Sequence, residues 1–329
     1  MRKFIFCSLL MAIVVIVLGA YTRLTDAGLG CPDWPGCYGE LFVPSSEDKV
    51  NAANSAFPER PLEPAKAWSE MVHRYFAGGL GIMIFVIAGW ALIKRDPRMP
   101  VGLPLFLCGL VVFQAALGMW TVTLNLLPVI VMGHLLGGFG VLTCLFILYL
   151  RLSPAMCRDK LKSAKRMLGF AFVGMIILGC QIALGGWTSA NYAALACTNL
   201  PVCEGQWWTQ IDVPGAYSVP PADNYEFGVH DYPARMTMHI IHRAGALITF
   251  AYLLTLGIWL LRVRSKLLNS AGTALITVLS AQVGLGISNV VMSLPLTIAV
   301  AHNFVAAMLL LIMVWITFNL SVIQRRAHG

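Results

Sequence analysis

The chain alternates between long apolar runs and polar connections, and eight of the runs are long enough to cross a lipid bilayer. A helix rises about 1.5 Å per residue, so about 20 apolar residues span a hydrocarbon core of about 30 Å. The predicted spans cover residues 4–20, 69–93, 101–121, 128–150, 167–187, 236–261, 268–292 and 296–320. This pattern predicts an all-α integral membrane protein with eight transmembrane helices.

Composition and charge agree with a membrane protein and indicate its orientation. Hydrophobic residues make up 58% of the chain and charged residues only 12%, about half of what soluble domains carry. Basic residues gather at both termini and in three short connections, which predicts cytoplasmic termini and two long outer loops, 21–68 and 188–235. The net charge of +8 therefore reflects sidedness in the membrane, and nucleic-acid binding is not expected.

The second half of the chain resembles the first. GAYTRLTDAGLGCPDWPGC (19–37) aligns without gaps with GGWTSANYAALACTNLPVC (185–203). Further landmarks keep nearly the same offset: His73-Arg74 with His242-Arg243, Gln114 with Gln282, and His134 with His302. We expect two tandem pseudo-symmetric four-helix bundles, 1–151 and 167–329, joined by a cytoplasmic linker, 152–166. The repeat also favours a retained first helix over a cleaved signal peptide, because its counterpart lies in mid-chain.

Four histidines share one depth near the outer ends of their spans: His73, His134, His242 and His302. A lone intramembrane histidine often only hydrogen-bonds a neighbour. Four at one level, two in each bundle, favour two pairs of facing metal ligands. Helical bundles hold heme in this way, with imidazoles on opposite faces of the iron. Arg74 and Arg243 are then either contacts for the anionic heme propionates or interfacial anchors.

Four of the nine cysteines lie in the predicted outer loops, as two pairs. Cys31 and Cys37 form one pair, and Cys197 and Cys203 form the other, each with five residues between its members. Disulfides persist on the non-cytoplasmic face of a membrane. The pairs are interpreted either as structural staples or as redox groups that pass electrons by thiol exchange.

Several ordered motifs resemble the heme A synthase family of heme-copper oxidase assembly. They are E-x-x-H-R at 70–74, histidines at 134, 242 and 302, LGAYTRLTDAGLGCPDWPGC and QAALGMWTV, and together they extend over essentially the whole chain. The resemblance implies an oxidoreductase that converts the C8 methyl group of heme O to the formyl group of heme A. It also implies a bacterial inner membrane and, as partners, the heme O synthase (a farnesyltransferase), oxidase assembly factors and an unidentified electron-transfer partner.

The resemblance gives the two halves different roles. His73 and His134 would ligate the substrate heme, whereas His242 and His302 would ligate a heme b cofactor. His239 lies one helical turn before His242 and could compete for that iron. Alignment with the His-Arg pair of the first half favours His242.

A carboxylate distinguishes the first half from the second. Glu70 lies one turn before His73, and the second half has His239 at the corresponding position. A carboxylate there could position water, accept a proton or stabilise positive charge during oxidation of a substituent. The asymmetry indicates, independently of the family, that the N-terminal half is the reactive one. The alternative role for Glu70 is an ion pair with Arg74 or another arginine.

Other classes of function stay open on the sequence alone. One is a di-heme cytochrome b that exchanges electrons with quinone, and another is a membrane thiol oxidoreductase that uses the outer cysteines and binds no heme. A transporter would leave the four level histidines without a role. A di-heme cytochrome b would yield only heme b when its hemes are extracted. A colourless purified protein would favour the thiol oxidoreductase.

Overall fold

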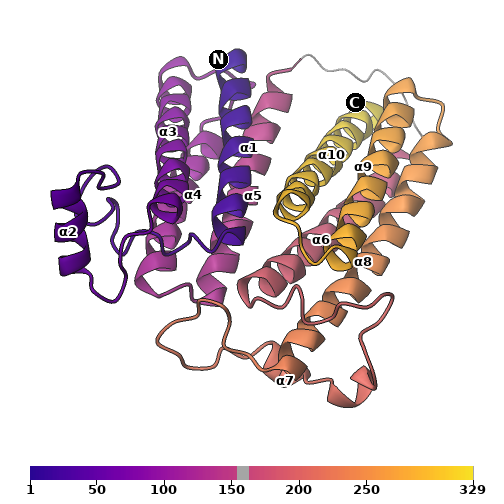
Figure 1. Cartoon of the computed structure of the whole chain (residues 1–329). Coiled ribbons are helices and arrows are strands. Elements are labelled where there is room, and N and C mark those ends of the chain that lie inside the picture. The colour runs from indigo at the N-terminus through magenta and orange to yellow at the C-terminus, as the bar shows by residue number, and fades with distance from the viewer. Residues whose placement is uncertain (154–162, 329) are drawn as a thin grey trace.

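The computed structural model describes residues 1–153 and 163–328, and helices dominate it (Figure 1). Within these residues, eight helices are long and apolar enough to span a membrane. They are α1 (Arg2–Leu24), α3 (Pro64–Lys94), α4 (Gly102–Thr123), α5 (Pro128–Arg151), α6 (Ala164–Ala190), α8 (Tyr232–Leu261), α9 (Lys266–Val291) and α10 (Leu296–His328). Three short helices, α2 (Glu47–Ala56), η1 (Trp207–Gln210) and α7 (Val213–Ala216), belong to the long loops, and the described residues contain no β-strand. The predicted all-α, multi-pass architecture is confirmed.

Two spans begin four or five residues earlier than hydropathy predicted. α3 begins at Pro64 rather than 69, and α8 begins at Tyr232 rather than 236. Hydropathy detects only the apolar part of a helix, whereas capping and a first-turn proline extend it into the polar interface. At α8 the Asp231 carboxylate accepts a hydrogen bond of 3.1 Å from the Ala234 amide. The histidines of these two helices therefore lie deeper along them than the predicted spans implied.

The eight spans pack as two rings of four helices. In one ring α1 and α4 each contact both α3 and α5, and in the other α6 and α9 each contact both α8 and α10. Helices α3 and α5 are therefore diagonally opposite, as are α8 and α10. The rings meet where α1 and α5 face α6 and α10 (Figure 1).

Corresponding turns in the two rings share an unusual backbone conformation. Asp26 and Tyr192, which align with each other, follow α1 and α6 with φ angles of 50° and 53°. The turns after α4 and α9 likewise contain two left-handed residues each: Asn125 and Leu126, and Ser293 and Leu294. Non-glycine residues rarely adopt this conformation. The matches support the predicted duplication, which stays a prediction.

The packed apolar core fills the half of each ring that lies farther from the long loops. It contains fully buried side chains from all eight spans, among them Ile5, Ile84, Leu107, Leu145, Met167, Leu256, Leu275 and Met313. On α3, α5, α8 and α10 these core positions follow the candidate histidines in sequence. The histidine half of each ring is therefore adjacent to the long loops and rests on a rigid, close-packed base.

The loop side also joins the two rings. The Tyr225 amide donates a hydrogen bond of 3.0 Å to the Asn125 carbonyl, and the Asn125 side chain donates one of 2.7 Å to the Asp223 carbonyl. Arg23, at the end of α1, donates to the Ser189 carbonyl at the end of α6. A cation is favourable there because unpaired carbonyls accumulate at a helix C-terminus.

Candidate heme sites

The first candidate pair, His73 and His134, comes from the diagonal helices α3 and α5. The ring centres lie 6.3 Å apart and the rings are nearly perpendicular, at 82°. A metal–imidazole bond is about 2 Å long, and a ring centre lies roughly 1.1 Å beyond its nitrogen. Two imidazoles that share one metal ion therefore have centres about 6 Å apart. The observed spacing fits axial ligation of a single iron.

The second pair, His242 and His302, has the same placement on the diagonal helices α8 and α10. Both pairs thus project from opposite corners of a four-helix ring, which is how bundles present ligands to a cofactor. The sequence prediction that facing helices supply the histidines agrees with this arrangement. The assignment of iron to them stays a prediction.

A glycine on a neighbouring helix supports each of the four imidazole rings. A methyl group added at these glycines would lie within 3.4 Å of the histidine Cε1 atom in every case. The distances are 2.9 Å for Gly19 and His73, 3.4 Å for Gly118 and His134, 3.0 Å for Gly185 and His242, and 3.2 Å for Gly286 and His302. Glycine thus permits the close approach of the helix backbone to the rings of His73, His242 and His302, whereas at Gly118 an added methyl group would be in ordinary contact with His134.

Unpartnered ring nitrogens support a ligand-binding role for the histidines. The Nδ1 atoms of His73, His134 and His302 are buried and make no well-directed hydrogen bond among the described residues, although the backbones of Val15, Gln114 and Gln282 lie beside the three rings. Buried polar atoms in proteins are nearly always partnered, so three such atoms at related positions call for an explanation. Paired imidazoles between glycine-lined helices form a donor set that fits heme iron.

Glu70 is buried beside the first pair, with 5% of its surface exposed. Its Oε1 atom lies 2.5 Å from the Arg74 guanidinium, and its Oε2 atom accepts a hydrogen bond of 2.9 Å from the Cys31 amide. Both oxygens are therefore held, one by a helix neighbour and one by the outer loop. The predicted ion pair with Arg74 is present in the structure, and a catalytic role for Glu70 stays a prediction.

Arg74 and Arg243 hold the outer loops against α3 and α8. The Arg74 guanidinium donates to the carbonyls of Asp33, Pro35 and Gly36, and Arg243 donates to those of Cys197, Asn199 and Pro201. The acceptors at 33 and 35 align with those at 199 and 201. Contact with heme propionates stays a prediction for both arginines, whose shared role in the structure is to fix these loops.

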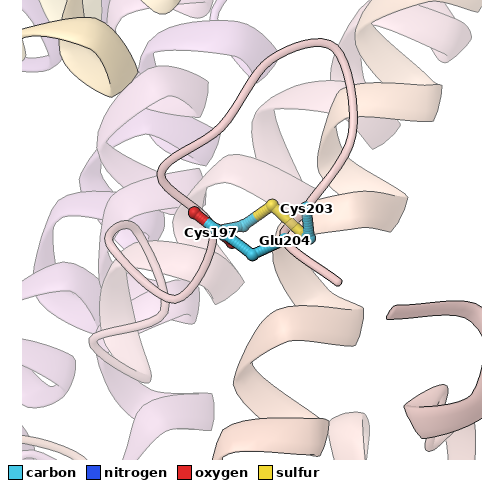
Figure 2. Close-up of side chains that lie close together, drawn as sticks. All are labelled: Cys197, Cys203 and Glu204. Carbon is cyan, nitrogen blue, oxygen red and sulfur yellow. A yellow bond between two sulfur atoms is a disulfide. The ribbon is translucent and has the colours of Figure 1, made fainter. Parts of the chain in front are cut away.

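Both loop cysteine pairs form disulfides, Cys31–Cys37 and Cys197–Cys203. Figure 2 shows the second disulfide next to Glu204. These three side chains lie close enough together to resemble a metal site, but the two sulfurs are bonded to each other and are not free thiolates. The disulfides agree with the staple interpretation, and a redox role is left untested.

Glu204 organises the loop that contains the second disulfide. Its Oε1 atom accepts hydrogen bonds from the Thr198 hydroxyl and from the amides of Thr198 and Asn199. The hydrogen bond from the Thr198 hydroxyl lowers the pKa of the Glu204 carboxyl, because it stabilises the charged form. Glu204 is therefore a structural acceptor in this loop.

His239 occupies the place on α8 that Glu70 has on α3. It is buried, with 5% of its surface exposed; its Nδ1 atom makes no well-directed hydrogen bond among the described residues, and the Ala193 backbone lies beside the ring. The supporting glycine of this helix pair, Gly185, contacts the ring of His242. This contact matches Gly19 with His73 and supports His242 over His239 as the predicted ligand.

The sequence reasoning missed Gln181, whose side-chain Nε2 lies 3.1 Å from Nδ1 of His242. A signal for it was present. Q-x-x-L-G occurs three times, at 114–118, 181–185 and 282–286, and each ends on a glycine that supports a histidine. The fourth supporting glycine ends V-x-x-L-G, at 15–19.

These features define a class of protein, a multi-pass helical membrane protein with two diagonal histidine pairs. The chain belongs to the COX15-CtaA family of cytochrome oxidase assembly proteins, which matches residues 2–314. It is 51% identical over 315 residues to the heme A synthase of Shewanella oneidensis, covering 95% of this chain and 94% of that one. It is 29% identical to the heme A synthase of Rickettsia prowazekii over 96% of both chains.

Proposed function

We propose that this protein is a heme A synthase, which oxidises the C8 methyl group of heme O to a formyl group. The family match over nearly the whole chain and the 51% identical relative support the proposal. The observation that carries it is Glu70, a buried carboxylate one turn from His73 in the first ring only. An electron-transfer cytochrome would have no need for this asymmetry.

In this proposal the two rings perform different tasks. His73 and His134 hold the iron of the substrate, heme O. His242 and His302 hold heme b, which supplies one-electron transfer when bound. The second ring has an imidazole in place of the carboxylate, so it lacks the negative charge that could stabilise positive charge at a reacting carbon.

Glu70 acts at the edge of the substrate. The Cys31 amide and the Arg74 guanidinium each hold one carboxylate oxygen, so the orientation of the group is fixed before the substrate arrives. Such preorganisation favours transition-state stabilisation, because the protein need not reorganise during the reaction. The carboxylate can then receive a proton at Oε2, the oxygen that faces the loop amide of Cys31 and not the Arg74 guanidinium.

The proposal also covers location and partners. By their charge pattern both termini face the cytoplasm and both disulfide loops face outward, in a bacterial inner membrane. The enzyme that attaches the farnesyl group of heme O would supply the substrate, and oxidase assembly factors would receive the product. A separate donor or acceptor of electrons would complete the cycle.

The proposal is tested by expressing the full chain in a cell that makes heme O but not heme A. We expect heme A, or a hydroxymethyl intermediate, among the chromatographically separated hemes. His302→Ala should remove low-spin heme b absorption while the protein stays in the membrane, because an axial ligand is lost. Heme b alone, with heme O unchanged, would instead support the di-heme cytochrome b, and a colourless protein would support the thiol oxidoreductase.

A further inference from the structure

Each candidate ligand histidine contacts a glycine on a neighbouring helix. The side chain four residues before that glycine, one helical turn earlier on the same helix, is not the same in all four cases. Three have a glutamine there, and one has a valine. The pairs are Gln114 with His134, Gln181 with His242, Gln282 with His302, and Val15 with His73. Only glutamine can hydrogen-bond an imidazole, so His73 is the exception among the four.

The Gln181 carboxamide is fitted closely to His242. Its Nε2 atom lies 3.1 Å from the ring Nδ1 atom and donates a second bond of 3.1 Å to the His242 carbonyl. Gly245 makes this possible, because a methyl group there would lie 2.3 Å from the Gln181 Oε1 atom. The contact thus depends on one residue from α6 and another from α8.

At His134 the glutamine is present but does not bond to the ring, because Gln114 Nε2 and His134 Nδ1 have no hydrogen-bond partner among the described residues. Gly137, three residues after this histidine as Gly245 is after His242, leaves room for the Gln114 carboxamide. A methyl group there would lie only 1.7 Å from the Gln114 Nε2 atom. At His302 the glutamine contacts the ring directly, with Gln282 Nε2 3.2 Å from the ring Nε2 atom.

His73 lacks both parts of this arrangement. Val15 aligns with Gln181, and Phe76 aligns with Gly245. The Val15 side chain offers no hydrogen bond, although its backbone lies beside the His73 ring, and Phe76 occupies the position that is glycine on the other helix. His73 Nδ1 is buried without a well-directed partner, as are Nδ1 of His134 and His302, but only His302 has a carboxamide at its other ring nitrogen.

We propose that Gln181 is a positioning residue that makes the second ring retain its heme, and that its absence beside His73 makes the first ring release heme readily. The inference rests on the proposed function, which assigns substrate to the first ring and a permanent cofactor to the second. A ligating imidazole is held in one tautomer and orientation by a hydrogen bond to its other nitrogen. The Gln181 nitrogen lies against Nδ1 in the structure, whereas a ring that binds iron through its other nitrogen keeps a proton on Nδ1; the carboxamide can accept that hydrogen bond through its oxygen after an amide flip.

The difference matches what each ring must do. A cofactor that relays electrons has to stay bound through many turnovers, so both of its histidines, His242 and His302, have a glutamine. A substrate has to enter and its product has to leave, so at least one histidine of the first ring would have to dissociate from the iron. Neither histidine of the first ring has a carboxamide hydrogen bond among the described residues, and at His73 the glutamine itself is replaced by Val15.

The test uses purified full-length protein in detergent and measures the rate at which heme passes to excess apomyoglobin. Gln181→Met keeps the side-chain length but removes the hydrogen bond, and it should release heme b about tenfold to a hundredfold faster than the unchanged protein. The low-spin electron paramagnetic resonance signal of that heme should shift too. Ile176→Met, on the exposed side of the same helix, is the matched control and should change neither.

The reciprocal variant tests the first ring independently. Val15→Gln with Phe76→Gly installs both parts beside His73, and it should slow the release of added heme O by a similar factor. If Gln181→Met does not accumulate in the membrane, this double variant by itself tests the inference. Unchanged release of heme O there, or of heme b from a folded Gln181→Met protein, overturns the inference.

Two variants distinguish a failure of this inference from a failure of the proposed function. If His302→Ala loses heme b while Gln181→Met releases it at the unchanged rate, the inference alone is wrong. If His302→Ala keeps heme b, the assignment of the second ring is wrong.

Discussion

Glu70 and Arg74 form an ion pair of 2.5 Å inside the protein, one helical turn apart on α3. The exposed fractions of their side chains are only 6% and 12%. The same arginine also donates to the carbonyls of the disulfide loop, and the loop amide of Cys31 donates to Glu70. The carboxylate, the arginine and the outer loop therefore form one connected unit beside His73.

Glu70→Gln separates a catalytic carboxylate from a structural one. Glutamine keeps the size and hydrogen-bonding capacity of the side chain but loses its charge and basicity. We expect both hemes to stay bound and formation of the formyl group to stop or slow strongly, so that heme O or a hydroxymethyl intermediate accumulates. Extracted hemes and a thermal melt are measured on the same preparation. A normal yield of heme A with a lowered Tm would show that the carboxylate is structural.

Arg74→Gln should destabilise the protein more than Arg243→Gln. Both substitutions release a loop, but only the first leaves a buried carboxylate without its partner, which costs about 3–5 kcal/mol. The position equivalent to Glu70 on α8 is His239, so Arg243 has no such partner. The double variant Arg74→Gln with Glu70→Gln should regain part of the lost stability. Equal thermal melts for the two single variants would contradict this account.

The Cys31–Cys37 disulfide is expected to act as a staple for the loop that holds Glu70. Replacing both cysteines by serine should cost about 2 kcal/mol, because the closed loop is short. Heme A formation should then fall with stability and recover partly at lower temperature. The Cys197/Cys203 double variant is the matched control, since its loop contacts no catalytic carboxylate. A stable, heme-replete Cys31/Cys37 variant without turnover would support electron passage through the pair instead.

Gly185→Ala tests the contact between α6 and His242. The added methyl group would lie 3.0 Å from the ring Cε1 atom, so the ring or the helix must move. We expect weaker heme b binding and a shifted absorption band. Gly179→Ala lies on the same helix with no atom within 4 Å of the added methyl group, and heme binding should be unchanged there. Equal heme content in the two variants would mean that this close approach has no part in heme binding.

The candidate ligands could be predicted from sequence because several independent patterns pointed to the same residues. The four candidates fall at one predicted depth, recur at a nearly constant offset and lie in apolar runs, where burying an imidazole costs free energy. They are His73, His134, His242 and His302. The loop contacts of Arg74 and Arg243 could not be predicted in the same way. Their acceptors are backbone carbonyls about forty residues earlier in the chain, and a carbonyl has no sequence signature.

Gln181 falls between these two cases. The Q-x-x-L-G motif occurs three times in the sequence. A glutamine in a membrane helix has many possible hydrogen-bond partners, however, and sequence periodicity does not identify which one it contacts. The neighbouring helix selects the partner, because Gly245 leaves space for the carboxamide, whose Oε1 atom would lie 2.3 Å from a methyl group added there. Such complementarity between two helices depends on how they pack.

The sequence by itself determined the eight spans, the order of the elements and the residue types available for iron. These follow from local properties, since a backbone in lipid must satisfy its own hydrogen bonds and therefore forms a helix wherever about 20 apolar residues occur in a row. The tertiary structure alone decided which helices are diagonal, which glycine supports which histidine, and that Glu70 is held by both Arg74 and Cys31. Those relationships depend on packing between segments far apart in the chain, where fractions of an ångström determine which side chains fit.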